Sequence, residues 1–233
     1  MLLATAAGMV LKDDLSLLII PAAIVCYAWV WWHRARATLA DDYVLLLGAM
    51  LVSAEVLMRW PRQFLPLAIV HGVGAYAYKS RLLLSLSISA LAAWMGVERR
   101  TAFDFSADLA PRAFLTAGLV IAWRQLHDRL SNIRDFLRVC EHFAANLALW
   151  GALSLASDPG YLLTIAVAAL VMAWGFKQRS EPFVLYAFVY AVIGADALLL
   201  HHFEHEAAII LISSVIAIAA LIAIDKRFRE RRG

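Results

Sequence analysis

The chain has 233 residues, of which 63% are hydrophobic and 17% are charged, and its mean hydropathy is +0.74. Soluble domains are about 45–50% apolar and about 25% charged, so this chain has too little polar surface to cover a water-soluble core. Its net charge of +3 comes from basic residues spread through short loops, which argues against a nucleic-acid partner. Composition predicts one integral membrane domain over residues 1–233, with the lipid bilayer as partner and no cofactor.

Ten apolar runs, separated by charged residues, predict helices. Helices are expected rather than barrel strands because the runs are continuous instead of alternating. In chain order the runs are Met1–Val10, Ser16–Trp32, Tyr43–Trp60, Leu65–Tyr78, Leu82–Val97, Pro111–Arg129, Cys140–Ser157, Tyr161–Phe176, Pro182–Phe203 and Ala207–Asp225. The predicted fold is all-α: a polytopic transmembrane bundle of about nine to ten helices, because the first run is too short to cross alone.

The C-terminal tail, DKRFRERRG, is strongly basic and is predicted to be cytoplasmic. Going backwards, the EHE loop is acidic and the KQRSE loop is basic, which fits alternating sides of a membrane. Ten crossings would put the N-terminus on the same side as the C-terminus, and nine would put it on the opposite side. We therefore expect a multi-pass protein of the cell inner membrane.

Two acidic residues lie inside apolar runs, Glu55 in Ser-Ala-Glu-Val-Leu and Asp196 in Gly-Ala-Asp-Ala-Leu. A carboxylate at membrane depth costs a few kcal/mol or more, so such a residue is a functional candidate by default. Facing a bundle interior, the two acids could bind a cation or relay protons, coupling the movement of an ion or solute. The alternative is a packing role with local hydrogen bonds, or an ion pair between Glu55 and Arg59 at the i,i+4 spacing.

The acid phrases also suggest an internal repeat with units 1–60 and 146–203. Leu17–Trp29 agrees with Leu162–Trp174 at six of thirteen positions and ends on the same tryptophan. The copies are an even number of helices apart, which predicts a parallel repeat about an axis along the membrane normal. Chance agreement between two Ala- and Leu-rich helices is the alternative.

His71 is a third coupling candidate, next to Gly72 and near Gly74. A membrane histidine beside small residues can also hydrogen-bond across a close helix contact, which would make its role one of packing.

Three histidines, His201, His202 and His205, lie near the end of a predicted helix. The i,i+4 spacing of His201 and His205 is typical of metal ligands on one helical face. A solvated, mildly acidic loop explains the same residues.

The connection between the sixth and seventh runs is rich in arginine and predicts an amphipathic segment at the cytoplasmic headgroups. There, basic side chains could contact anionic lipid or a partner, or only set the topology. They are Arg124, Arg129, Arg134 and Arg138.

Three segments, Leu84–Glu98, Cys140–Leu155 and Phe183–Asp196, resemble a family of bacterial polytopic membrane proteins that is defined only as a domain of unknown function. The resemblance implies a bacterial inner-membrane location and implies no activity.

No catalytic motif is recognisable, so an enzyme is not the favoured interpretation. The leading hypothesis is transport of a small solute or ion with Glu55 and Asp196 as coupling groups. The second is a non-catalytic membrane scaffold or accessory subunit, acting as a homo-oligomer or with a membrane partner. The third is a metal-dependent membrane enzyme that uses the three histidines.

Overall fold

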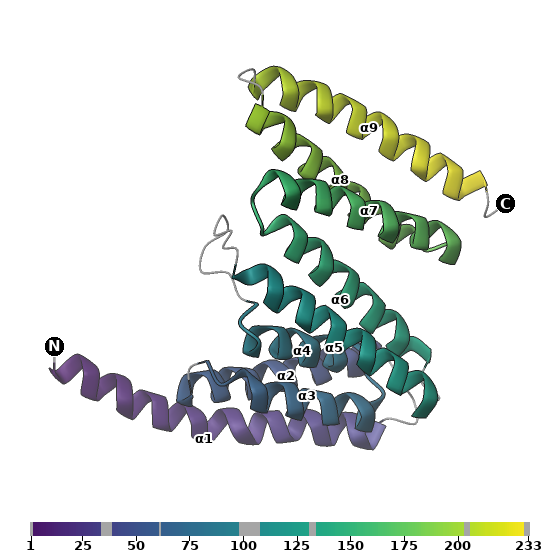
Figure 1. The fold of residues 1–233 in the computed structure, drawn as a ribbon. Coiled ribbons are helices and arrows are strands. Elements are labelled where there is room, and N and C mark those ends of the chain that lie inside the picture. Colours follow the sequence, from purple (N-terminus) through teal and green to yellow (C-terminus); the bar gives the residue numbers. More distant parts are fainter. Residues whose placement is uncertain are drawn as a thin grey trace. The chain divides into compact units, whose positions relative to one another are not determined.

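The computed structural model describes residues 2–33, 39–60, 62–97, 108–130, 134–202 and 206–230. Over these ranges the chain forms nine helices and no strand, which confirms the all-α prediction (Figure 1). The helices are α1 (Leu2–His33), α2 (Leu39–Arg59), α3 (Phe64–Tyr78), α4 (Arg81–Trp94), α5 (Leu109–Leu130), α6 (Arg134–Leu153), α7 (Asp158–Gln178), α8 (Glu181–His202) and α9 (Glu206–Glu230).

The first two predicted runs form one helix, α1, so the expected break between Val10 and Ser16 is wrong. The intervening residues, Leu-Lys-Asp-Asp-Leu, include no glycine or proline, and charged residues continue a helix at little cost. Pro21 lies inside the same helix.

Two other helices start earlier than the sequence predicts. Asp158-Pro159-Gly160 lies between two predicted runs and has the composition of a turn, but it forms the first turn of α7. Ser157 caps that helix by accepting a hydrogen bond from the Gly160 N–H at 3.4 Å, and proline is favourable at a first-turn position. Helix α6 begins at Arg134, ahead of the predicted Cys140.

Contacts divide the chain into two compact units, each described here by itself. Unit 1 comprises Met1–Gly96 and Trp123–Cys140, and unit 2 comprises Val97–Ala122 and Glu141–Gly233.

In unit 1, α1 packs on α2 and α3 packs on α4, and α2 also contacts α3 and α4. A Cβ placed on Gly48 of α2 would lie 3.0 Å from the Cys26 Cβ of α1, so this glycine allows the first pair to approach closely. The α3–α4 turn contains Lys79 in the left-handed conformation (φ 53°) and Ser80, which caps α4.

In unit 2, α7 packs on α8, and α8 also contacts α9. Two glycines lie in the α7–α8 contact, Gly175 against Phe183 and Val184, and Gly194 against Thr164. Small residues of this kind let helix backbones approach closely where lipid provides no hydrophobic driving force.

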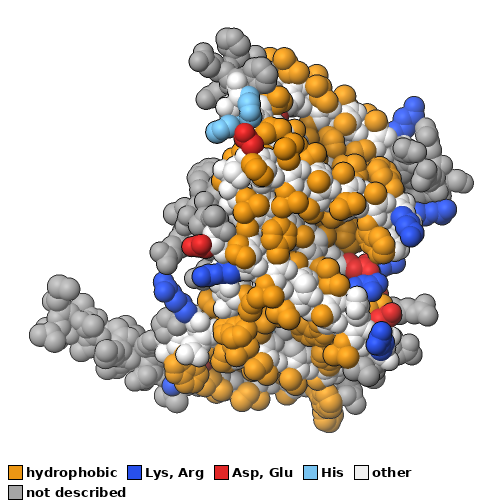
Figure 2. Space-filling view, viewed as in Figure 1, with side chains coloured by type: hydrophobic (Ala, Val, Ile, Leu, Met, Phe, Trp, Pro, Cys, Tyr) orange, Lys and Arg blue, Asp and Glu red, His pale blue; other side chains and the backbone are white. Residues whose placement is uncertain are grey.

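Large apolar side chains are exposed on helices of both units. Examples are Trp32 at 84%, Leu18 at 73%, Leu170 at 71% and Leu211 at 67% exposed. Figure 2 shows hydrophobic side chains over most of the visible described surface. Helices α7 and α8 are each long and apolar enough to cross a membrane, and their most apolar windows are only 22% buried. A core helix of a soluble protein would be mostly buried, so these two helices fit a membrane better.

Candidate functional site

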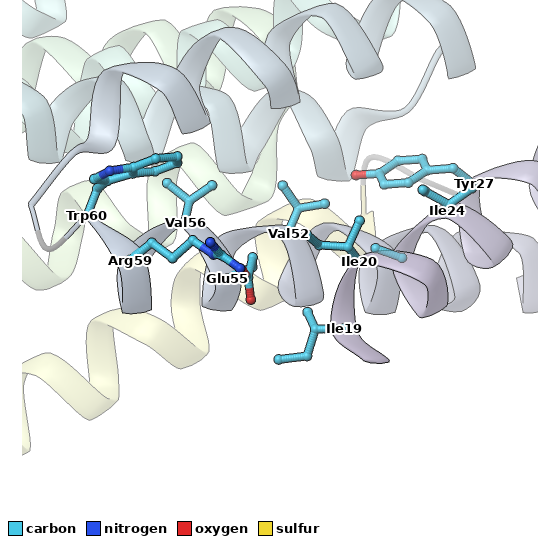
Figure 3. A pocket seen from close by; sticks show the side chains of 10 residues that line it. Ile19, Ile20, Ile24, Tyr27, Val52, Glu55, Val56, Arg59 and Trp60 are labelled. Atoms are coloured by element: carbon cyan, nitrogen blue, oxygen red, sulfur yellow. The ribbon is translucent and has the colours of Figure 1, made fainter. Parts of the chain in front are cut away.

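A cavity in unit 1 lies between α1 and α2 and has a volume of about 430 Å³ (Figure 3). Aliphatic side chains provide most of its wall, and an acidic, a basic and two aromatic residues complete it. The lining residues are Ile19, Ile20, Ala23, Ile24 and Tyr27 of α1, with Val52, Glu55, Val56, Arg59 and Trp60 at the end of α2.

Glu55 is the acidic residue of this cavity and is only 7% exposed. One carboxylate oxygen, Oε1, accepts a hydrogen bond from Arg59 Nε, so the i,i+4 ion pair expected as the alternative from spacing is present. The Arg59 side chain is 44% exposed. The second oxygen, Oε2, is buried and has no hydrogen-bond partner among the described residues. A buried carboxylate oxygen without a hydrogen-bond partner carries a desolvation cost.

His71 belongs to α3 and lies where that helix contacts α2. It is 2% exposed, and its Nε2 lies 2.8 Å from Ser53 Oγ. Because the Ser53 hydroxyl donates its one proton to the Ala49 carbonyl at 2.8 Å, the His71 Nε2–H donates to Ser53 Oγ. The remaining ring nitrogen, Nδ1, is then a buried acceptor with no described partner.

Ser87 of α4 adds a second polar group to the centre of the α3–α4 contact. Its hydroxyl donates to the Ala68 carbonyl at 2.7 Å, and a Cβ on Gly72 would lie 3.0 Å from its Oγ. The packing role expected for the histidine and its neighbouring glycine is therefore seen here, as a hydrogen bond from His71 and a close approach at Gly72.

Glu55 and His71 are not brought into one site. Ser53 and Glu55 are two residues apart on α2, which places them on different helical faces. Ser53 meets α3 through His71, whereas Glu55 lines the cavity with α1.

Asp196 belongs to unit 2 and is half-buried. Its Oδ2 accepts a hydrogen bond from Ser213 Oγ of α9 at 3.2 Å, and the same hydroxyl also lies 3.1 Å from the Ile210 carbonyl. Asp196 thus links α8 to α9, and one hydroxyl proton serves two acceptors. Because Glu55 lies in the other unit, a shared polar space for the two acids stays a prediction.

The histidines at the end of α8 lie near Asp158 at the start of α7. His202 Nε2 is 3.6 Å and His201 Nε2 is 3.9 Å from the Asp158 carboxylate oxygens, and all three side chains are at least 40% exposed. No group of three or more such side chains within the described ranges is arranged to hold a metal ion. His205 lies outside the described residues, so the metal hypothesis stays a prediction.

The four candidate arginines lie on α5 and α6. Arg124 is half-buried and has contacts of its own, whereas Arg129 and Arg138 are exposed; Arg134 begins α6, and its side chain lies outside the described parts. The predicted amphipathic connection is therefore made largely of the extensions of two helices.

Sequence reasoning did not single out Ser53, Ser87 or the aromatic group around Tyr76. The Tyr76 hydroxyl accepts a hydrogen bond from Trp123 Nε1 at 2.8 Å, and Tyr76 lies against His127 and Phe136. Polar residues near the middle of apolar helices were the available signal for the two serines.

No protein-family model, curated protein or solved structure matches this chain.

Proposed function

We propose that this chain is a multi-pass integral membrane protein in which nine helices cross the bilayer. The exposure of large apolar side chains in both units supports this, because soluble proteins rarely expose contiguous apolar surface of this extent. Helices α3 and α4 are short, at 15 and 14 residues, and would need local thinning of the bilayer.

The distribution of basic residues supports an orientation with the C-terminus in the cytoplasm. Alternating crossings put the α3–α4, α5–α6 and α7–α8 turns on the C-terminal side, and basic residues flank each of them. The α6–α7 turn falls on the opposite side and has no lysine or arginine. Two connections on the outer side go against the trend: the α2–α3 turn with Arg59 and Arg62, and the connection between α4 and α5 with Arg99 and Arg100. Nine crossings put the N-terminus outside, and a bacterial inner membrane is the location that the sequence favours.

Within that membrane we assign the chain to the handling of a small solute or ion, with the α1–α2 cavity as its site. One observation carries this: Glu55, an acidic side chain that is 7% exposed within an otherwise apolar stretch of α2, lines this cavity. Intramembrane carboxylates are costly, and they mark ion and substrate pathways. Asp196 has a weaker case, because its hydrogen bond to Ser213 gives it a structural role between α8 and α9.

Ion flux in proteoliposomes tests this assignment. Purified protein is reconstituted into vesicles loaded with a pH-sensitive dye, and proton flux is measured under a pH gradient with sodium present or absent. We expect flux above that of empty vesicles, and we expect Glu55→Gln to reduce it at least tenfold, since the exchangeable charge is lost.

Asp196→Asn is the matched control, because it removes a helix carboxylate in the other unit. Wild-type flux equal to that of empty vesicles, or full flux in Glu55→Gln, would contradict ion handling by this cavity.

A further inference from the structure

We propose that unit 1 binds the headgroup of an anionic phospholipid through Lys79, Arg81 and Arg138, which together form the headgroup site. This inference goes beyond ion handling by the α1–α2 cavity. It rests only on the membrane assignment, which puts the α3–α4 and α5–α6 turns at the cytoplasmic surface of the bilayer.

The headgroup site joins residues that are far apart in the sequence. Arg81 begins α4, and its Nε lies 3.9 Å from Oδ2 of Asp135, near the start of α6. Arg138 follows Asp135 by three residues, so the two side chains are neighbours on one face of α6. Lys79 lies in the α3–α4 turn, two residues before Arg81. Three exposed basic side chains and one exposed carboxylate thus lie at this end of unit 1.

Aromatic contacts hold the two parts of the headgroup site together. The Tyr76 hydroxyl of α3 accepts a hydrogen bond from Trp123 Nε1 of α5 at 2.8 Å. The Tyr76 ring also contacts the ring of Phe136 of α6, which is buried and directly follows Asp135, with centroids 5.5 Å apart. The basic side chains are therefore carried by helices that already contact one another, and such preorganisation lowers the entropy cost of binding a ligand.

The charge at this end of unit 1 favours an anion. The charged side chains described at the α3–α4 and α5–α6 ends are five cations and three carboxylates, which leaves a surplus of two positive charges. They are Lys79, Arg81, Arg124, Arg129 and Arg138, with Asp128, Asp135 and Glu141.

The weak pairing of Arg81 leaves it able to bind a phosphate. Its side chain is 66% exposed, that of Asp135 is 63% exposed, and their separation of 3.9 Å is longer than a hydrogen bond. Exposed pairs of this kind contribute little to stability. A guanidinium binds phosphate oxygens through two parallel N–H donors, so a lipid phosphate can compete with Asp135 for Arg81.

An exposed apolar stripe along α3 leads to the headgroup site and fits an acyl chain. Ile69 and Val73 are exposed and lie four residues apart, and Tyr76 continues the same helical face. Tyr78 ends α3 directly before Lys79, and tyrosines at helix ends mark the headgroup level of a bilayer. A phosphate at the turn with an apolar chain along α3 matches a phospholipid, whereas a soluble anion would make no use of the stripe.

Native mass spectrometry of the purified full chain in a non-ionic detergent tests the proposal. The protein is titrated with dioleoylphosphatidylglycerol, which is anionic, and with dioleoylphosphatidylcholine, which has the same chains and no net charge. A basic residue near an anionic lipid surface contributes about a fivefold gain in binding, and Asp135 offsets part of it. We expect the anionic lipid to bind at about tenfold lower concentration than the zwitterionic lipid.

Three double variants locate the effect. Arg81→Gln with Arg138→Gln should weaken binding of phosphatidylglycerol about tenfold, to the level of phosphatidylcholine. Arg81→Lys with Arg138→Lys keeps the charge but loses the paired donors, and should weaken it about threefold. The matched control, Lys177→Gln with Arg179→Gln, removes the same charge from the α7–α8 turn of unit 2 and should change binding less than twofold. Thermal unfolding of each variant checks that it is folded.

The proposal is overturned if the two lipids bind the wild type equally, or if the α7–α8 control loses as much binding as the glutamine variant. Displacement of phosphatidylglycerol by an equal concentration of inorganic phosphate would also overturn it, because the site would then bind a soluble anion. A preference for phosphatidylglycerol without ion flux would uphold the headgroup site and reject ion handling. Flux that depends on Glu55, with no lipid preference, would do the reverse.

Discussion

The α3–α4 and α7–α8 hairpins end in the same kind of turn but are held together by different contacts. In each, a basic residue in the left-handed conformation follows the first helix, Lys79 at φ 53° and Arg179 at φ 54°, and a serine follows it. The contacts made by the helices of the two hairpins differ. His71 and Ser87 place polar groups inside the first hairpin or at its boundary with α2, whereas the second is close-packed through Gly175 and Gly194.

This difference indicates that the α7–α8 hairpin has a structural role only. The α7–α8 contact is close-packed at Gly175 and Gly194, and the buried Thr164 hydroxyl there donates to the Gly160 carbonyl of its own helix. Both helices have the length of a simple membrane crossing. The α3–α4 hairpin is shorter and keeps a buried ring nitrogen without a described partner. Buried groups of this kind also occur in unit 2, where the Tyr186 hydroxyl of α8 has no described partner, so it is the cavity lined by Glu55 that makes unit 1 the place where function is expected.

The largest expected effect comes from filling the α7–α8 contact. A Cβ on Gly175 would lie 2.8 Å from Val184 Cγ2 and 2.9 Å from Phe183 Cβ, so Gly175→Leu should cost about 3 kcal/mol of unfolding free energy. Unfolding in mixed micelles measures it. Gly118→Leu is the control, since a Cβ there meets nothing within 4 Å. Equal costs for the two variants would show that the α7–α8 contact is not tight.

Removing the hydrogen bond between His71 of the α3–α4 hairpin and Ser53 of α2 should have a smaller effect on the unfolding free energy. His71→Ala deletes a side chain that is 2% exposed together with its hydrogen bond to Ser53, and we expect a loss of about 2 kcal/mol. His71→Gln can keep an N–H near the Nε2 position and should recover about half of the loss. The same micelle unfolding assay measures both. If glutamine is no better than alanine, the hydrogen bond does not contribute.

The smallest expected effect is at Arg179, the left-handed residue of the α7–α8 turn, where a substitution should stabilise the protein instead of destabilising it. A left-handed conformation costs a non-glycine residue about 1 kcal/mol, so Arg179→Gly should raise the unfolding free energy by about 0.5–1 kcal/mol. Lys177→Gly, at a helical position two residues earlier, should lower it by roughly as much. Thermal unfolding of both variants checks the pair of signs; destabilisation by Arg179→Gly would mean that its side chain contributes more than its backbone costs.

The helices could be predicted from the sequence because continuous apolar runs give a strong local signal. That signal was misleading where local chemistry is ambiguous: Lys12 to Asp14 looked like a break but continue α1, and Asp158-Pro159-Gly160 looked like a turn but begin α7. The Glu55–Arg59 pair was also accessible, because an i,i+4 spacing determines proximity within one helix.

The rest of the site depends on contacts between helices, which one sequence does not specify. Nothing local indicates that Ser53 meets His71 from another helix, or that Ile19 and Ile20 face Glu55 across a cavity. The role of Asp196 likewise depends on Ser213 being presented by α9.

Cysteine labelling of the turns tests the membrane assignment most directly. Single cysteines replace Lys79, Arg179, Arg62 and Asp158 in a background with Cys26→Ser and Cys140→Ser, and a membrane-impermeant maleimide is applied to intact spheroplasts and to inverted vesicles. With nine crossings, positions 62 and 158 label from outside, and positions 79 and 179 label only in inverted vesicles. Labelling of all four positions from one side, or recovery of the protein in the soluble fraction, would contradict the assignment.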